Sequence, residues 1–223
     1  MTDFNRRLFL AASASAPVAL APIALAPIAL ATATPAAAAS GDITLKAALE
    51  GRQSSRRFAP TPVPEDALLR LLWAANGVNR PDSGGRTSPS WRSANDTIIY
   101  VATAGGLFRH AHETNTLEKI GDTDIRAESS DSAFVSRAPA LLIFVSDGEA
   151  LRKAAEGADE QALAIGAHVN AAICAQNVYL ACVAEGLGTC LIGGAANREA
   201  IAKALDLPQG SIVTYIQPVG TAR

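Results

Sequence analysis

The sequence predicts an α+β fold with a mixed central sheet flanked by helices, and three observations support this class. Apolar segments with strand character alternate with helical patterns along the chain. Residues 140–145 are continuously apolar, which indicates a strand that is buried on both faces. Residues 160–185 form a long helical segment that is apolar on nearly every face. We expect this helix to lie at the centre of the fold or in a subunit interface.

Two helices are expected before the first strand. Residues 44–50 form a short helix that ends at Gly51. The second helix opens at Pro64, a residue that suits the first turn, and its leucines form one apolar stripe as far as Gly77. Residues 76–96 are rich in Asn, Pro, Gly and Ser and are therefore predicted to be loop.

The strands follow this loop in order. Residues 97–102 have strand composition, and residues 106–110 and 116–120 are predicted to form a hairpin around a polar turn at 112–115. Three elements are expected beyond the long helix: a strand at 189–192, a helix capped by Asn197 and a closing strand at 212–217.

The first 39 residues have the features of an export signal. Arg6 and Arg7 precede an uncharged run rich in Ala, Pro, Leu and Ile, and small residues end the run. The paired arginines resemble the bacterial twin-arginine signal, whose usual leading Ser or Thr is Asn5 here. We therefore expect a signal peptide at residues 1–39 and one domain at 40–223 that is exported to the periplasm or secreted.

An uncleaved membrane anchor is the alternative for this segment, because the apolar run reaches the roughly 20 residues that span a bilayer. Prolines at positions 17, 22 and 27 make the run a poor helix and favour a signal. Twin-arginine export carries folded proteins, commonly ones that have received a cofactor in the cytoplasm. The signal therefore favours a redox cofactor.

Composition and motifs exclude several function classes. A net charge of −2 gives no overall basic field for nucleic acid or for an anionic membrane surface. The glycine-rich cradles for dinucleotides and triphosphates do not occur in the sequence, nor do GxSxG and HExxH. The cysteines at 174, 182 and 190 form no CxxC pair and have apolar neighbours, so we interpret them as core residues.

The histidines raise the alternative of a metal site. His110 and His112 would share one face of a strand, and His168 could supply a third ligand. No carboxylate or cysteine pattern supports coordination, and exposed histidines at a hairpin tip are the commoner arrangement. We therefore predict no bound metal.

The strongest local signal is the segment GRQSSRRF at residues 51–58. It contains Arg52, Arg56 and Arg57 out of only 19 Lys and Arg in the chain, interleaved with Gln53 and two serines. A solvated run of charge is the alternative interpretation. A guanidinium group can donate two parallel hydrogen bonds to phosphate oxygens, and serine hydroxyls can donate the remaining ones. The segment therefore indicates a site for a phosphate and a polar ring edge.

Four motifs together resemble the nitroreductase superfamily of FMN-dependent oxidoreductases. Residues 52–58 resemble its R-x-S-x-R-x-F segment, and residues 88–90 resemble its S-P-S loop before a central strand. Residues 186–194, GLGTCLIGG, resemble its G-L-G-T-x-x-I-x-G turn, and residues 219–223 resemble its closing V-G-x-x-[KR]. The motifs occur in the family's order, and the resemblance covers residues 43–223.

The resemblance implies an FMN held between two subunits of an intertwined homodimer with exchanged chain ends. Arg52, Ser54 and Arg223 would bind its phosphate, and Gln53 its ribityl chain or ring edge. Arg56 would lie at the pyrimidine end, where a cation stabilises the negative charge of the reduced ring.

The remaining motifs would contact the ring. Ser88, Pro89 and Ser90 would come from the partner chain, and the backbone N–H of Gly194 would face flavin N5, because glycine permits a close backbone approach. A plain turn is the alternative for Gly193 and Gly194. Substrate residues do not carry over, because the residues after the S-P-S loop differ from the family's and its Glu before the second glycine is absent.

The expected function is an exported FMN-dependent oxidoreductase that transfers hydride through N5 in two half-reactions. The donor is a small molecule such as NAD(P)H, which is scarce outside the cytoplasm, and the acceptor is a nitroaromatic, a quinone or a similar molecule. No side chain is expected to be catalytic by itself, and we expect no nucleic-acid partner and no membrane insertion after signal cleavage.

Two other functions remain open. Residues 73–81 and 106–126 are similar to the branch of the family that includes the azoline-peptide dehydrogenases, which points to a flavin-dependent dehydrogenase or a flavin-consuming enzyme. A flavin-binding dimer without turnover is the other alternative.

Overall fold

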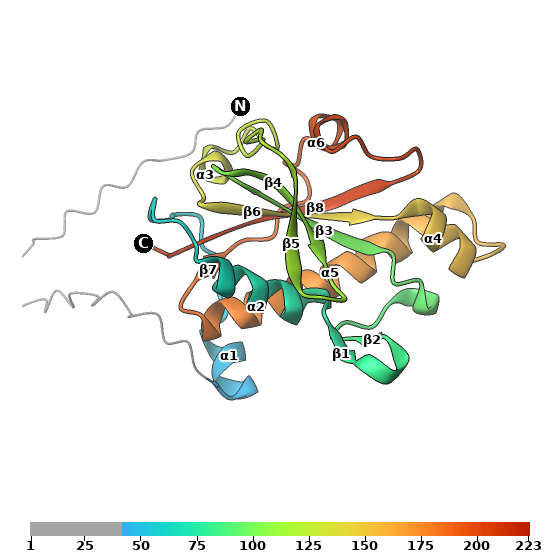
Figure 1. Cartoon of the computed structure of the whole chain (residues 1–223), viewed down its shortest axis with the longest axis horizontal. Helices are drawn as coiled ribbons and strands as arrows, with labels where there is room; N and C mark the ends of the chain where they lie inside the picture. The colour runs from blue at the N-terminus through green and yellow to red at the C-terminus, as the bar shows by residue number, and fades with distance from the viewer. Residues whose placement is uncertain (1–41) are drawn as a thin grey trace, which may run out of the picture. The chain divides into compact units, whose positions relative to one another are not determined.

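The computed structural model describes residues 42–223, so the predicted signal at 1–39 lies outside the described residues (Figure 1). The helices are α1 (Leu45–Gly51), α2 (Glu65–Asn76), α3 (Ala133–Ser136), α4 (Gly148–Ala154), α5 (Glu160–Ala184) and α6 (Arg198–Ala204). The strands are β1 (Val78–Arg80), β2 (Gly85–Arg86), β3 (Thr97–Thr103), β4 (Gly106–Ala111), β5 (Thr116–Gly121), β6 (Ala140–Ser146), β7 (Gly188–Thr189) and β8 (Ile212–Gly220). Single 3₁₀ turns occur at Pro81–Ser83 and Trp91–Ser93.

Six strands form the central sheet in the order β5-β4-β3-β6-β8-β7. All neighbouring pairs of these strands are antiparallel. An isolated bridge between Ser54 and Thr189 adds a parallel pairing at the β7 edge, so the mixed sheet that was predicted is present in residues 42–223. The last strand of the chain, β8, therefore lies inside the sheet rather than at its edge.

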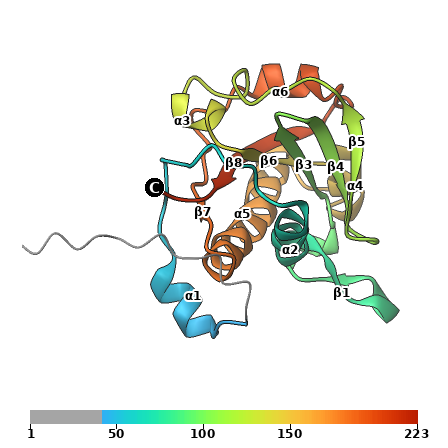
Figure 2. The ribbon, with the colours of Figure 1, turned by 60° about the vertical axis from the view of Figure 1, so that its left-hand side comes forward.

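The two faces of the sheet bury different helices, as the alternation of side chains in β6 shows. Leu142 and Phe144 pack with α2 and α5 in one cluster. Leu141 and Ile143 pack on the other face in a second cluster that includes Ile201 of α6. Figure 2 shows α2 and α5 on one side of the sheet and α3 and α6 on the other. β6 is buried on both faces, as its apolar sequence predicted.

The long helix α5 packs against the sheet and against α1 and α2, and one of its faces stays exposed. Its first turn is capped by Asp159, whose side chain accepts a hydrogen bond from the Ala162 N–H. Its length and composition would also suit a membrane span, but many of its residues are buried against α2, β8 and α1. Ile165 and Val169 are 57% and 47% exposed one turn apart, and they leave an uncovered apolar face in this chain.

Most predicted elements are confirmed, two predictions need correction and two helices were missed. Residues 76–96 are not loop throughout, because β1 and β2 pair as a small antiparallel hairpin. The strand expected at 189–192 is shorter: β7 ends at Thr189, and only an isolated bridge joins Ile192 to Ile216. Helices α3 and α4 were not predicted, although Asp147 caps α4 with two hydrogen bonds. The exchange of chain ends concerns a second copy and stays a prediction.

Candidate functional site

The arginine-rich segment forms an extended edge beside the end of the chain. The Ser55 N–H donates to the Thr189 carbonyl at 2.8 Å, which fixes the segment along β7. Further on, Phe58 bridges Ala222, and the Arg223 N–H donates to the Arg57 carbonyl at 3.1 Å. The first and last motifs of the domain are therefore held together by backbone hydrogen bonds.

Tyr179 of α5 connects this segment to the turn after β7. Its hydroxyl oxygen lies 3.0 Å from Ser54 Oγ and accepts a hydrogen bond of 2.8 Å from the Leu191 N–H. The Arg52 guanidinium lies 5.3 Å from the centroid of the Tyr179 ring, within the range of a cation–π contact. The sequence analysis missed Tyr179, although a tyrosine in a largely apolar helix is a detectable signal.

The two glycines after this turn occupy different surroundings. A Cβ on Gly193 would lie 3.1 Å from the Tyr215 ring, whereas a Cβ on Gly194 would meet nothing within 4 Å. The Arg198 guanidinium donates to the Gly193 carbonyl at 2.9 Å and holds the turn. Gly194 therefore leaves open space at an exposed backbone, as a site for a bound ring requires.

His168 of α5 lies beside the same turn. Its ring contacts Tyr215 edge-on, with 5.1 Å between the centroids. Burial, and then the nearby Arg198 charge, hold the pKa of His168 below its ordinary value. These surroundings therefore favour the neutral imidazole over the charged form.

Two cavities border the arginine-rich segment. The larger, here called the arginine cavity, has a volume of about 620 Å³ and is lined by Arg56, Arg57, Phe58, Phe134, Arg137 and Arg223. The smaller has a volume of about 180 Å³, and Gln53 and Tyr179 are among the residues that line it. The structure thus brings Arg52 and Ser54 together at Tyr179, and Arg56 and Arg223 together in the arginine cavity.

The S-P-S segment makes its hydrogen bonds elsewhere. The Ser88 hydroxyl donates to the Ala75 carbonyl, and the Asn177 side-chain amide donates to Ser88 Oγ at 3.1 Å. Ser90 Oγ accepts from the Asn95 N–H at 2.9 Å, and Pro89 is exposed. Within one chain this segment is therefore anchored to α2 and α5, with Pro89 free to contact another molecule.

Of the two hairpin histidines, His112 lies in the turn between β4 and β5 and is half-buried. His110 lies in β4 and is buried, which corrects the expectation that both are exposed. His110 Nε2 lies 2.9 Å from Asn115 Oδ1, while His112 Nε2 lies 2.6 Å from an Arg86 nitrogen. Burial lowers the pKa of both imidazoles. Within residues 42–223 no group of three or more His, Cys, Asp or Glu side chains is placed to hold a metal ion.

Comparison with known proteins gives one consistent family. The model of the Nitroreductase family matches residues 49–221. The chain is 32% identical to a solved protein of Ralstonia eutropha JMP134 assigned to the nitroreductases, with a TM-score of 0.74 over 82% of this chain and 85% of the other. It is 27% identical over 168 residues to a protein of Methanocaldococcus jannaschii with the same assignment, covering 71% of this chain and 82% of the relative.

A more distant likeness concerns the fold alone. The NADPH:FMN oxidoreductase of Vibrio harveyi, solved with NAD⁺, superposes with a TM-score of 0.58 at 21% identity, over 79% of this chain and 69% of that one.

The sheet and the family match identify an enzyme of the oxidoreductase class. The chain belongs to the nitroreductase family, as its match over residues 49–221 shows. Members of this family bind FMN and are typically dimers. The residues described here fit that cofactor: guanidinium and hydroxyl donors at Arg52 and Ser54 suit a phosphate, and the open space at Gly194 suits a ring.

Proposed function

We propose that this chain is an FMN-dependent oxidoreductase that passes hydride from a small-molecule donor to an acceptor at a single site. One observation carries the proposal. The Tyr179 hydroxyl joins Ser54 to the Leu191 N–H, so the arginine-rich segment and the glycine turn border the same part of α5. A ligand with a phosphate at one end and a flat ring at the other would contact both segments.

Five residues are assigned to the cofactor's tail and pyrimidine end. Arg52 and Ser54 bind the phosphate together with Arg223, and Gln53 contacts the ribityl chain or the ring edge. Arg56 stabilises the charge that reduction places on the pyrimidine ring. The support is that four of these residues lie within the continuous segment 52–56, and that backbone hydrogen bonds hold the adjoining residues 57 and 58 to the chain's end at 222 and 223.

The ring would be held by the glycine turn and by a second subunit. The Gly194 backbone N–H faces N5, and Gly193 continues the turn that Arg198 anchors. The partner subunit's Ser88, Pro89 and Ser90 cover the ring, and the exchanged chain ends complete the homodimer. The exposed Ile165 and Val169 of α5 support a second copy against this helix.

Bound FMN supplies the hydride-accepting and hydride-donating atom. The residues of this chain bind and orient the cofactor, keep water from the ring and stabilise the reduced charge, and no acid–base step is assigned to a side chain. The donor is NAD(P)H or another small reductant, and the acceptor is a nitroaromatic, a quinone or a similar molecule.

The enzyme would work outside the cytoplasm. The support is the twin-arginine pattern at Arg6 and Arg7 followed by the proline-interrupted apolar run, which together suggest a signal at 1–39 and a mature domain at 40–223. Because the phosphate ligands come from both ends of that domain, the cofactor would be bound by the folded chain before export.

Absorbance spectra of the purified protein test the cofactor. We expect flavin bands, and we expect Arg52→Ala to lower FMN affinity at least about tenfold, because a charge-assisted hydrogen bond to phosphate contributes about 1.5–3 kcal/mol. Lys153→Ala, which removes an exposed cation from α4, is the matched control and should retain flavin. Unchanged flavin retention in Arg52→Ala would reject the phosphate assignment.

The reaction is tested by anaerobic bleaching of the bound flavin. Bleaching by NADH or NADPH, followed by recovery on adding a quinone, supports the two half-reactions. A flavin that is bleached only by a substrate with an oxidisable C–N or C–C bond would favour the dehydrogenase alternative. A flavin that no donor reduces would favour a binding protein without turnover.

A further inference from the structure

Two asparagines of α5 hold the S-P-S segment, residues 88–90, one at each end. The Asn177 side-chain amide donates to Ser88 Oγ at 3.1 Å. Asn170 Oδ1 accepts at 2.7 Å from the N–H of Trp91, the residue that follows the segment. The two asparagines are seven positions apart, which is about two helical turns, so they lie on one face of the helix. The segment is therefore seated along a single stripe of α5.

The first end of the segment also docks on the C-terminus of α2. An α-helix leaves its last four carbonyls without partners inside the helix. In α2 the Ala74 carbonyl accepts from the Asn177 amide at 2.9 Å, and the Ala75 carbonyl accepts from the Ser88 hydroxyl. Ser88 is buried and Asn177 is half-buried. The Ser88 hydroxyl is therefore occupied inside its own chain.

The second end is held by a buried polar pair and a constrained loop. Asn170 and Asp96 are both buried, and the Asn170 amide donates to Asp96 Oδ1 at 2.7 Å. Residues 42–223 contain five non-glycine residues with positive φ, and three of them precede Asp96: Arg92 at 51°, Ser93 at 55° and Asn95 at 49°. Such conformations persist only where the surrounding structure holds them. The Asn95 N–H in turn donates to Ser90 Oγ at 2.9 Å, which closes the loop onto the segment.

Pro89 is the part of the segment that these anchors leave exposed. The serine hydroxyls on either side of it both make hydrogen bonds within the chain. Proline has a fixed φ and a rigid apolar ring, and it lacks a backbone N–H. The group that the segment offers to another molecule is therefore the flat face of Pro89.

The S-P-S segment and the rest of the proposed cofactor site lie on opposite faces of α5 in one chain. Tyr179, which contacts Ser54 and the Leu191 N–H, follows Asn177 by two positions. Each position turns a helix by about 100°, so the side chains of Tyr179 and Asn177 project about 160° apart. A flavin on the Tyr179 side of one chain is therefore separated by the helix from the S-P-S segment of that chain.

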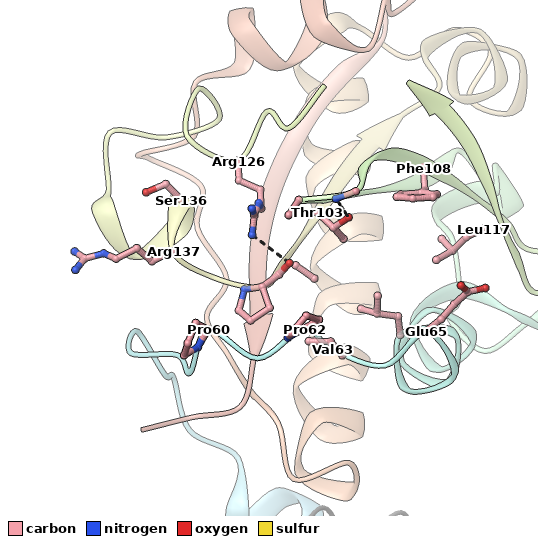
Figure 3. Close-up of a pocket in the computed structure, with 15 residues that line it drawn as sticks. Pro60, Pro62, Val63, Glu65, Thr103, Phe108, Leu117, Arg126, Ser136 and Arg137 are labelled. Atoms are coloured by element: carbon pink, nitrogen blue, oxygen red, sulfur yellow. Dashed lines mark hydrogen bonds between the residues drawn. The ribbon is translucent and has the colours of Figure 1, made fainter. Parts of the chain in front are cut away.

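The cavity next to the arginine cavity provides no cover from the same chain either. Its volume is about 470 Å³, and it lies between the segment 60–63 and the turn between β3 and β4 (Figure 3). It shares Arg137 with the arginine cavity, but the Arg137 guanidinium points away from Phe108 and Leu117 at the apolar end. None of residues 88–90 lines either cavity. Cover for the ring by this segment therefore requires a second copy.

We propose that Asn170 and Asn177 are positioning residues that set Pro89 against the flavin bound by the partner subunit. Each asparagine acts through the S-P-S segment and touches neither the cofactor nor the substrate. The inference rests on the proposed function, because it needs a flavin beside the glycine turn of the second copy. It goes further by assigning the contact to Pro89 and the geometry of that contact to α5 of the opposite subunit.

Asn177→Ala tests the first anchor, because it removes both amide hydrogen bonds. After dialysis the full-length variant should retain about fivefold less flavin than the natural protein, as the loss of one or two neutral hydrogen bonds predicts. Gln176→Ala changes the neighbouring, exposed amide of the same helix and should stay within about a factor of two of the natural protein. Thermal melting shows whether Asn177→Ala folds. If it does not, Ser88→Ala removes the same contact from the other side and decides.

Gly166→Ala tests the second anchor without touching the buried Asn170. A Cβ at this position would lie 2.3 Å from the Trp91 ring, so the ring and the loop that follows it must shift. Flavin retention should fall as it does in Asn177→Ala. A folded Gly166→Ala variant that retains flavin like the natural protein would reject the part of the proposal that concerns Asn170.

A hybrid dimer separates this role from a merely structural one. Chains with Arg52→Ala and chains with Asn177→Ala are co-expressed with different affinity tags, and dimers that carry both tags are purified. If Asn177 acts on the partner's site, one site of the hybrid carries both substitutions and the other carries neither. The hybrid should therefore retain about half the flavin of the natural dimer, with natural affinity at the intact site. Tyr179→Phe takes the place of Arg52→Ala if the latter retains its flavin.

Two results would overturn the inference: flavin retention in Asn177→Ala equal to that of Gln176→Ala, or a hybrid in which neither site recovers natural affinity. The second result is expected if Asn177 acts only on its own subunit or only on the stability of the fold. A natural protein that binds no flavin would overturn the proposed function and this inference with it. A natural protein that binds flavin and reduces quinones, while its hybrid restores no site, would overturn the inference alone.

Discussion

The hydroxyl oxygens of Ser54 and Tyr179 lie 3.0 Å apart, although 125 positions separate the two residues in the chain. The same tyrosine oxygen accepts a hydrogen bond from the Leu191 N–H. One side chain of α5 thus aligns the arginine-rich segment with the turn that leads to Gly193 and Gly194. Its removal should disturb both ends of the proposed cofactor site at once.

Tyr179→Phe should lower both FMN affinity and stability. Phenylalanine keeps the ring below Arg52, so the change removes only the hydroxyl and leaves the Leu191 N–H without its acceptor. We expect about 1–2 kcal/mol less free energy of unfolding in urea, and FMN that dialyses away faster. Tyr100→Phe, the same chemical change on the other face of the sheet, is the control. Equal effects from the two variants would contradict the role of Tyr179.

The exposed face of α5 should mediate dimerisation. Ile165→Glu combined with Val169→Glu places two charges one turn apart on that face, and burial of unpaired charges in an interface is unfavourable. Light scattering should show a dimer for the natural sequence and a monomer with poor flavin retention for the variant. Ile120→Glu changes another exposed isoleucine, on β5, and should remain dimeric. A flavin-loaded monomer of the natural sequence would argue against a shared site.

Asn170 should be essential for stability. It is buried in α5, where its side-chain amide donates to Asp96 Oδ1 at 2.7 Å and its oxygen accepts from the Trp91 N–H at 2.7 Å. Asn170→Ala leaves a buried carboxylate short of one donor, and we expect it to lower the free energy of unfolding by about 3 kcal/mol. Gln176→Ala, at an exposed position of the same helix, should change it by less than about 0.5 kcal/mol in urea titrations.

The buried Cys174 thiol should make stability fall in alkaline solution. Burial raises its pKa to about 11 from an ordinary value of 9.0. As the pH rises, Cys174 loses its proton at a lower pH in the unfolded chain than in the folded chain. The contribution of the protonated thiol to the free energy of unfolding is therefore fully present below pH 9 and is lost between pH 9 and 11. Two pKa units correspond to about 2.7 kcal/mol.

Urea unfolding of the natural sequence and of Cys174→Ala at several pH values isolates this contribution. The difference in stability between the two proteins should narrow by roughly 2–3 kcal/mol from pH 8 to pH 11. A difference that stays constant with pH would mean that Cys174 titrates alike in the folded and unfolded chains. Burial also raises the pKa of Cys182, so the natural protein should lose more stability than Cys174 alone explains.

Export should require the guanidinium groups of Arg6 and Arg7, and not only their positive charge. Substituting Lys for both Arg6 and Arg7 keeps the charge but removes the forked donors that a receptor can recognise. We expect the variant to accumulate in the cytoplasm at full length and with FMN bound. An ordinary secretory signal needs only positive charge at this point and would still export it. Processed variant outside the cytoplasm would reject the twin-arginine assignment.

The sequence predicted the parts of the fold that depend on local pattern. The continuous apolar run at 140–145 and the composition of 160–185 identified β6 and α5, because burial on all sides demands such composition. Helix α3 has four residues and β2 only two, too few for any period to be visible. These short elements are stabilised by tertiary contacts rather than by their own propensity.

The candidate site was predictable only in part. The arginines and serines of residues 52–56 stand close together in the sequence, so their chemistry could be recognised without a structure. The contact of Ser54 with Tyr179 could not, because nothing local relates positions on a loop and on a helix so far apart. Arg137 was likewise missed: a single arginine after a short helix carries no pattern, and only the fold makes it a wall of two cavities.

The internal position of β8 has a consequence for how the protein is made. The strand between β6 and β7 is synthesised after every other strand of the described residues. Until β8 has been synthesised, the backbone edge of the largely apolar strand β6 is unpaired, and residues 57 and 58 lack their partners at 222 and 223. Nascent chains and products of premature termination therefore present an open strand to chaperones and proteases instead of a partly assembled enzyme. Synthesis of β8 is thus the step that commits this chain to its native sheet.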